Sequence, residues 1–300
     1  MESSPVDPVT PIASTAVLEH FRPWQGTVPS GFFAYFLGNR TRADYWAFSE
    51  ELRRIYDRER FEAFAGPPID DNIFDWLILL ESVVEARDAF TMVALGAGWG
   101  RWLVAAGLAV RQFSGIPCRL IGVEAEPTHF QWMLQHFRDN DLDPADHDLI
   151  QAAASSRSGD AWFYFGKPAS WYGQSIIRDE AVDKITNENE IEYNSERAMR
   201  VRTVDLPELT ERYGRIDYLH MDVQGAELYI LEAAPEILDK KVKRVLIGTH
   251  STEIEEGLRK LFGALNWRCQ YDVPLNGKIA VGDVHVTLGD GVQVWINPKL

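Results

Sequence analysis

The sequence predicts an α/β fold that is built on a mainly parallel sheet and preceded by a helical segment. From Phe90 onward, short apolar runs alternate with stretches of helical periodicity, which is typical of repeated βα units. Before that point, residues 41–65 and 73–84 place apolar side chains at helical spacing. We therefore expect an N-terminal helical cap or arm over residues 1–88 and an α/β domain over residues 89–300.

Within the expected cap, residues 1–30 contain several prolines and little periodicity, so an irregular lead-in is predicted there. The first cap helix, at about residues 41–65, should end at Gly66-Pro67-Pro68 because glycine and proline interrupt helices. The second, over residues 73–84, should bury its apolar positions.

The α/β domain contains candidate strands in its short apolar runs, which are Thr91–Leu95, Arg119–Val123, Leu149–Ala152, Trp162–Phe165, Arg200–Val204, Asp217–Met221 and Val242–Ile247. The segments between them predict helices at Trp99–Phe113, Pro127–Asn140, Leu206–Tyr213, Ala226–Leu238 and Thr252–Leu265. A C-terminal β extension is expected from Trp267–Val273 and Val292–Ile296, joined by a glycine-rich connection. The acidic residues 179–196 predict a solvated loop, with a mobile lid as the alternative.

Composition and charge limit the class of protein. Hydrophobic residues make up 46% of the 300 and charged residues 25%, as in ordinary globular proteins. Thirty basic residues against 45 acidic ones give a net charge of −15, so we expect a small-molecule acceptor and no nucleic acid as partner. No apolar run approaches the roughly 20 residues that a bilayer requires, so no membrane partner is expected.

The cell compartment and assembly are predicted from a few features. The first residues carry Glu2 and Asp7 but no basic region, unlike a secretory signal peptide. Cys118 and Cys269 are too few for a disulfide framework. We therefore expect a cytoplasmic protein, and the sequence is compatible with a homo-oligomer.

The sharpest motif is a glycine-rich turn between a strand and a helix, Gly96-Ala97-Gly98-Trp99-Gly100. Glycine allows a close approach of the backbone to a ligand, and the helix N-terminus offers free N–H groups. The dinucleotide fingerprint would place its last glycine at Arg101, which weakens the interpretation as a nicotinamide site. A plain tight turn is the structural alternative.

A carboxylate follows the second strand of the domain. In doubly wound sheets, an acidic side chain at the position of Glu124 accepts hydrogen bonds from the hydroxyls of an adenosine ribose. Its neighbour Glu126 is either a surface residue or the true ribose ligand. Together with the glycine turn, Glu124 favours a cofactor that contains adenosine.

Two further polar residues end later strands. Asp222 follows an apolar strand, and His250 follows the next one, so both are expected at the edge of the sheet where α/β proteins bind ligands. Asp222 as a helix N-cap, and His250 as a structural histidine, are the alternatives. Both side chains suit a metal ion, but two candidates make a weak case, and we predict no metal.

These motifs resemble those of a known family. Leu95–Gly100, Val123–Phe130 and Met221–Glu227 are similar to the motifs of FkbM-type methyltransferases, which are class I enzymes that use S-adenosylmethionine (SAM) and mostly methylate oxygen atoms of small molecules and glycans. The likeness covers about residues 90–271. It implies a seven-stranded, Rossmann-like class I methyltransferase sheet whose last strand is antiparallel.

The resemblance also implies roles for individual residues. The cofactor would lie against Gly96, Ala97, Gly98, Trp99, Gly100, Glu124, Ala125, Gln151, Ala152, Ala153 and Asp222. Glu124 would bind the ribose and residues 151–153 would lie near the adenine. Asp222 would lie beside the transferred methyl group, and His250 matches a histidine that the family often carries after its fifth strand.

Two positions depart from the family pattern. Ala94 replaces an acidic residue two positions before the first glycine, which predicts weaker SAM binding. Gln224 replaces the more frequent glutamate. The cap and the C-terminal residues lie outside the matched region, so the resemblance says little about the acceptor.

We therefore expect a SAM-dependent O-methyltransferase in which His250 removes the acceptor's proton and Asp222 assists. The acceptor should lie between the carboxyl edge of the sheet, the cap, residues 166–197 and the C-terminal residues. Its expected contacts are Trp171, Tyr172, Gln174 and Gln224. A nicotinamide-dependent oxidoreductase and a non-catalytic protein that binds SAM or a nucleotide are the alternatives.

Overall fold

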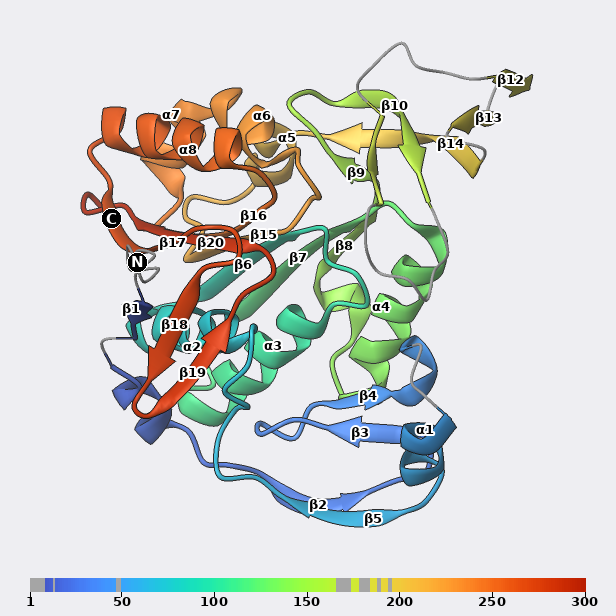
Figure 1. Cartoon of the computed structure of the whole chain (residues 1–300), viewed down its shortest axis with the longest axis vertical. Coiled ribbons are helices and arrows are strands. Elements are labelled where there is room, and N and C mark those ends of the chain that lie inside the picture. Colours follow the sequence, from blue (N-terminus) through green and yellow to red (C-terminus); the bar gives the residue numbers. More distant parts are fainter. Residues whose placement is uncertain are drawn as a thin grey trace, which may run out of the picture.

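At the centre of the fold lies a seven-stranded sheet (Figure 1). In this computed structural model the described residues are 9–12, 14–46, 50–165, 174–177, 184–187, 190–193 and 196–300. The strands of the central sheet are, in order, β17 (Arg268–Val273), β20 (Gly291–Ile296), β16 (Arg244–Thr249), β15 (Tyr218–Met221), β6 (Phe90–Leu95), β7 (Cys118–Glu124) and β8 (Asp148–Gln151).

The strand directions match the expected class I methyltransferase sheet. The five strands from β16 to β8 are parallel, whereas β20, the last strand of the chain, runs antiparallel to both of its neighbours. Every residue of β6 is buried, as expected for a central parallel strand with both faces covered. The prediction of this fold class is confirmed.

Helices cover both faces of this sheet (Figure 1). On one face, α2 (Ile73–Glu85), α3 (Arg101–Phe113) and α4 (Pro127–Asp139) share one hydrophobic core with the sheet. On the other face, the second core includes residues of α5 (Leu206–Thr210), α6 (Glu227–Glu232), α7 (Pro235–Lys241) and α8 (Thr252–Ala264). The helix expected at 226–238 is divided into α6 and α7 because Pro235 lacks an N–H and disfavours a helical residue before it.

The N-terminal 88 residues are less helical than expected. The helix predicted over residues 41–65 is wrong outside α1 (Glu50–Tyr56), because the residues on both sides of α1 form short strands or 3₁₀ turns. These elements are β1 (Val9–Pro11), η1 (Ala16–His20), β2 (Gln25–Val28), β3 (Phe32–Ala34), β4 (Arg40–Arg42), η2 (Ala43–Tyr45) and β5 (Arg60–Ala63). Moreover, α2 packs into the core of the main sheet, so it belongs to the α/β layers.

A second sheet lies beside the carboxyl edge of β7 and β8 (Figure 1). It contains β9 (Ala153–Ala154), β10 (Gly159–Tyr164), β11 (Ser175–Ile176), β12 (Lys184–Asn187), β13 (Glu190–Tyr193) and β14 (Glu196–Val204). The solvated loop predicted for residues 179–196 is wrong where they are described, since β13 pairs with β12 and β14. Backbone pairing of these strands overrides the acidic composition that indicated a loop.

The glycine-rich C-terminal connection contains a hairpin of β18 (Lys278–Val281) and β19 (Val284–Thr287). Strand β1 pairs in parallel with β18, so residues 9–11 are attached to the C-terminal part of the fold. In the described part of the chain, no helix is long and apolar enough to cross a bilayer.

The place of α2 in the core can be tested at Trp76, which is fully buried and packs edge-on against Phe36 and Trp102. We expect Trp76→Ala to lower the free energy of unfolding by about 3–5 kcal/mol, the usual cost of removing a buried aromatic side chain. Phe61→Ala on β5 is the control, because that ring is 68% exposed. Equal denaturation midpoints for both variants would contradict this placement.

Candidate functional site

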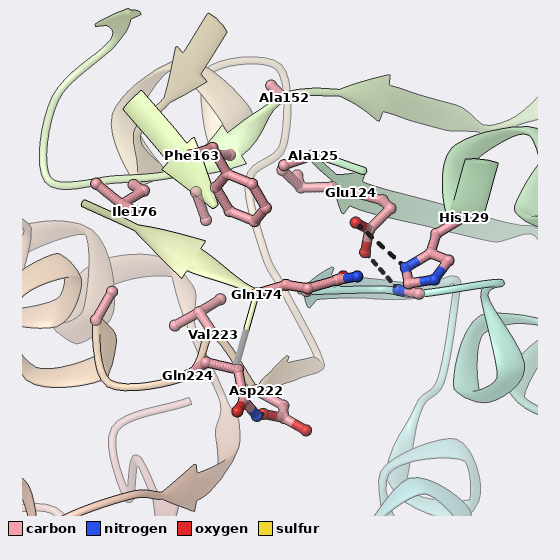
Figure 2. Close-up of a pocket in the computed structure, with 16 residues that line it drawn as sticks. Glu124, Ala125, His129, Ala152, Phe163, Gln174, Ile176, Asp222, Val223 and Gln224 are labelled. Atoms are coloured by element: carbon pink, nitrogen blue, oxygen red, sulfur yellow. Dashed lines mark hydrogen bonds and ion pairs between the residues drawn. The ribbon is translucent and has the colours of Figure 1, made fainter. Parts of the chain in front are cut away.

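A cavity opens at the carboxyl ends of β6, β7 and β15, where the glycine turn meets the second sheet (Figure 2). Most of the expected cofactor residues line it. The lining comprises Gly96, Gly98, Val123, Glu124, Ala125, His129, Ala152, Ala153, Ala154, Phe163, Gln174, Ile176, Asp222, Val223, Gln224 and Ala226.

The glycine turn is required by its geometry. Gly96 and Gly98 both have positive φ, at 74° and 55°, which is costly for residues with a Cβ atom. A Cβ on Gly96 would also lie only 1.9 Å from the backbone oxygen of Asp222. The turn therefore brings the end of β6 against the end of β15 and leaves a smooth backbone surface toward the cavity.

Glu124 is the buried carboxylate of this cavity, with only 7% of the residue exposed. Its two oxygens accept hydrogen bonds from the backbone N–H groups of Gly98 and Glu126, each at 2.8 Å. Burial raises the pKa of Glu124 to about 7, although these two hydrogen bonds favour the charged form. Hydroxyl groups that donate to the carboxylate would stabilise it further.

Glu126 has a different role from Glu124. Its carboxylate accepts a hydrogen bond from the backbone N–H of His129 at 2.6 Å and caps the N-terminus of α4. The side chain of Glu126 is not part of the cavity lining described above. The structure thus places the carboxylate of Glu124, and not that of Glu126, in the cavity wall, and its role as the ribose ligand stays a prediction.

Gln174 provides an independent sign of a polar ligand. Its side-chain nitrogen is buried and has no hydrogen-bond partner in the described part of the protein. Figure 2 shows the amide reaching from the side of β11 across the cavity toward Glu124. A buried donor without a partner is unfavourable, so a hydrogen-bond acceptor atom of a ligand would stabilise this side chain. Gln174, which we expected to contact the acceptor, therefore lies in the cofactor cavity.

A hydrogen-bonded cluster borders the cavity at Asp222 and Gln224. His250 contacts Glu227 through Nδ1 at 2.9 Å, and the side-chain nitrogen of Gln224 lies 2.9 Å from its Nε2. Gln224 also donates to Asp222 at 2.9 Å. Because a carboxylate only accepts and an amide nitrogen only donates, this arrangement fixes the tautomer with a proton on Nδ1 and a lone pair on Nε2.

The charge of His250 depends on its carboxylate neighbours. Burial opposes protonation, but the hydrogen bond and charge of Glu227, with the charges of Asp222 and Asp290, raise the pKa of His250 above its ordinary value. Our expectation of an imidazole near its unperturbed pKa is corrected in this direction. For Asp222, whose side chain is 48% exposed at the cavity rim, crowding by protein raises the pKa while His250 lowers it.

The same cluster contains ligand types that suit a cation. Ligand atoms of Asp222, Glu227 and His250 lie within 4.8 Å of one another. However, one oxygen of Glu227 already accepts from His250 and from the backbone N–H groups of Val223 and Gly225. These bonds hold the histidine and the turn, while the second oxygen of Glu227 is buried and has no hydrogen-bond partner in the described part of the chain.

Some expected residues lie elsewhere. Trp99 packs against Tyr45 and Trp46, and a Cβ on Gly100 would meet Met133, so both support the loop from behind. Ala97 and Gln151 are also outside the cavity lining. Trp171 and Tyr172 fall outside the described residues, so their contacts with the acceptor stay a prediction.

Glu227 was expected at the opening of a helix and not among the site residues. Its helix-start position, five residues after Asp222, was the available signal, but the contact with His250 depends on the fold. The aromatic wall at Phe163 was also missed, because it comes from the second sheet.

The sheet order, the glycine turn and the buried carboxylate after the second strand together define a class I methyltransferase. The chain belongs to the FkbM methyltransferase family, whose domain model matches residues 95–272. A curated protein of Jannaschia sp. (strain CCS1) with a provisional methyltransferase name is 28% identical over 290 residues, which are 94% of this chain and 98% of that protein.

Solved structures of methyltransferases resemble the chain more distantly. A precorrin-6Y C5,15-methyltransferase from Geobacter metallireducens GS-15 has 8% identity and a TM-score of 0.43, over 85% of this chain and 94% of that one. An FkbM methyltransferase from Methylobacillus flagellatus KT has 12% identity and a TM-score of 0.43, over 76% and 55%.

Family membership makes S-adenosylmethionine the cofactor, and the cavity fits it. Glu124 can accept from its ribose hydroxyls, Gln174 offers an unused donor, and the glycine turn allows close backbone contact. Ala94 is buried in β6 and offers no carboxylate, so the expectation of weaker cofactor binding stays a prediction.

The two neighbouring glutamates give a test of the ribose site. Glu124→Ala should weaken SAM binding by about 1–3 kcal/mol, since it removes charge-assisted hydrogen bonds to hydroxyl groups. Glu126→Ala should leave SAM affinity nearly unchanged but lower stability by about 0.5–2 kcal/mol through the lost helix cap. Calorimetry and denaturation of both variants check this; the opposite order of affinities would make Glu126 the ribose ligand.

The pKa of Glu124 predicts a pH dependence of cofactor binding. The ionised carboxylate accepts ribose hydroxyls better than the protonated one, so affinity should fall as pH decreases through about 7. With S-adenosylhomocysteine as ligand, the dissociation constant should rise about ten-fold between about pH 8 and pH 6. Glu124→Gln should bind more weakly with little pH dependence; a steep dependence retained in that variant would assign the titration to another group.

Proposed function

We propose that the protein transfers the methyl group of SAM to a hydroxyl group of a small molecule, with His250 as the proton acceptor. The observation that supports this is the position of His250, which lines a second cavity. Its Nε2 lies 3.4 Å from Oδ1 of Asp222, and Asp222 lines both this second cavity and the cofactor cavity. A hydroxyl acceptor must lose a proton during methylation, and a neutral imidazole is suited to take it.

The second cavity is the proposed acceptor site. It lies at the ends of β15 and β16, and Asp222 and Gln224 line both cavities. The start of α2 and residues 288–292 complete its wall. Donor and acceptor would therefore meet at the wall that contains Asp222 and Gln224.

Hydrogen bonds hold the base in position. Glu227 is fully buried and fixes the imidazole through Nδ1, which leaves the Nε2 lone pair toward Gln224 and Asp222. When Nε2 takes a proton, Glu227 and Asp222 stabilise the resulting imidazolium. Gln224 would have to release Nε2 to an acceptor hydroxyl.

Gln224 itself is held in an unusual conformation, with φ at 53°. A non-glycine residue at positive φ carries backbone strain of order 1 kcal/mol, and such strain is common at functional sites. Here it turns the amide toward both His250 and Asp222. SAM supplies an activated methyl carbon, so the protein's part is to align the reactants and accept the proton.

Transfer of a labelled methyl group tests this function directly. The protein should convert ¹³C-methyl SAM and a hydroxyl compound from an extract of the source organism into a product with a methoxyl carbon resonance. A product labelled on nitrogen or carbon would overturn O-methylation. Tight SAM binding without any transfer would support the alternative of a non-catalytic SAM-binding protein.

His250→Ala should lower the turnover number by about 10²–10⁴-fold, the usual share of general-base catalysis, while SAM affinity stays near wild type. In the wild type, the rate should fall on acidification through the raised pKa of His250, because the protonated imidazole cannot accept a proton. This acidic limb should vanish in the variant. His285→Ala, on the exposed hairpin, is the matched control.

Near-normal turnover of a folded His250→Ala protein at saturating acceptor would contradict the assignment. Proton removal would then fall to Asp222 or to water.

A further inference from the structure

The side chains that line the second cavity carry mainly negative charge. Its volume is about 320 Å³, enough for a small molecule. Four carboxylates line it, and its described lining includes no lysine or arginine. The carboxylates belong to Asp71, Asp75, Asp222 and Asp290.

Among the described residues, the ion pairs of these carboxylates are with histidines. None of the four carboxylates forms a salt bridge with lysine or arginine in the described part of the chain, and the histidine pairs involve Asp75 and Asp222. Arg101 lies near Asp71, but its guanidinium stacks on Tyr35 and Trp102 and donates to Asn72. Burial, together with the charges of Asp70 and Asp75, raises the pKa of Asp71.

The same wall also contains a buried histidine, one ring nitrogen of which has no hydrogen-bond partner among the described residues. His220 is 5% exposed, and its Nε2 contacts Asp75 at 2.8 Å. Its Nδ1 is buried and has no hydrogen-bond partner in the described part of the protein. Since His220 lines the cavity, a polar group of a bound molecule would supply the hydrogen bond that this nitrogen lacks.

Building on the proposed function, we propose that the acceptor is a cationic hydroxyl compound, such as an amino alcohol or amino sugar. Its ammonium group would bind among Asp71, Asp75 and Asp290, and its hydroxyl would face His250. An ammonium offers three donors to carboxylates that lack a basic partner, whereas a carboxylate or phosphate would be repelled.

The negative charge of these carboxylates also determines which atom of the acceptor is methylated. Neighbouring carboxylates raise the pKa of an amine and keep it protonated, and a protonated amine has no lone pair with which to attack a methyl carbon. The hydroxyl oxygen of the same compound has a lone pair and can attack the methyl carbon. In the transfer, this oxygen forms a bond to the methyl carbon as the carbon–sulfur bond breaks, and the hydroxyl proton goes to His250 Nε2. The products are the methyl ether and S-adenosylhomocysteine.

The experiment separates a metabolite extract of the source organism by charge. Cationic, neutral and anionic fractions from ion exchange at about pH 7 are each incubated with the protein and methyl-labelled SAM. We expect labelled product in the cationic fraction, with the label on oxygen. Label in only the neutral or anionic fraction would overturn this inference and leave methyl transfer intact. No label in any fraction, despite SAM binding by calorimetry, would overturn the proposed function and the inference with it.

Variants then test the cavity itself. Asp71→Asn and Asp290→Asn should each raise the KM for the cationic acceptor about ten-fold, with SAM affinity and turnover at saturation near wild type. Asp283→Asn is the matched control, because this exposed aspartate lies in the nearby hairpin turn outside the cavity lining. Unchanged KM values in both cavity variants would contradict ammonium binding at this wall, even if a cationic acceptor is found.

Discussion

The close contact between the ends of β6 and β15 determines the geometry of both cavities. The backbone N–H of Asp222 donates to Leu95 at 3.1 Å, and the N–H groups of Gly96 and Ala97 donate to Val123. Since Gly96 has no Cβ, its backbone can lie against the carbonyl of Asp222. The ends of three neighbouring strands are thereby tied together, and their polar side chains reach one edge of the sheet.

This constraint explains why the sequence could indicate the cofactor site. Glu124, Asp222 and His250 each follow a buried parallel strand, and the carboxyl ends of such strands necessarily meet at one edge. Glycines with positive φ are equally visible in a sequence, because few other residues tolerate that conformation. Local pattern and sheet topology therefore indicate the glycine turn, Glu124 and Asp222, but not Phe163 and Gln174, which reach the cavity from the second sheet and its edge.

The acceptor half could not be predicted in this way. Asp75 meets His220 across 145 residues of sequence, and Asp290 comes from the C-terminal part of the chain. These contacts depend on α2 packing into the sheet's core, whereas its amphipathic pattern alone suggested a separate cap. The second sheet was not predicted as a separate sheet. Apolar runs indicated strands at Trp162–Phe165 and Arg200–Val204, which correspond to β10 and β14, but the pairing of these strands with each other and of β14 with β13 depends on the fold.

The carboxylates of the two cavities differ in their hydrogen-bond and ion-pair partners. In the cofactor cavity, the carboxylate of Glu124 accepts hydrogen bonds from two backbone N–H groups, and it can also accept hydrogen bonds from hydroxyl donors of a ligand. In the second cavity, Asp71 accepts a hydrogen bond from the side-chain amide of Asn72 at 2.6 Å, and in the described part of the chain neither Asp71 nor Asp290 forms a salt bridge with lysine or arginine. Carboxylates kept close together without a basic partner repel one another, and bound positive charge relieves that repulsion. Asp222, between the two cavities, would face a sulfonium on one side and an ammonium on the other, which fits a site that assembles two cationic reactants around a fixed negative wall.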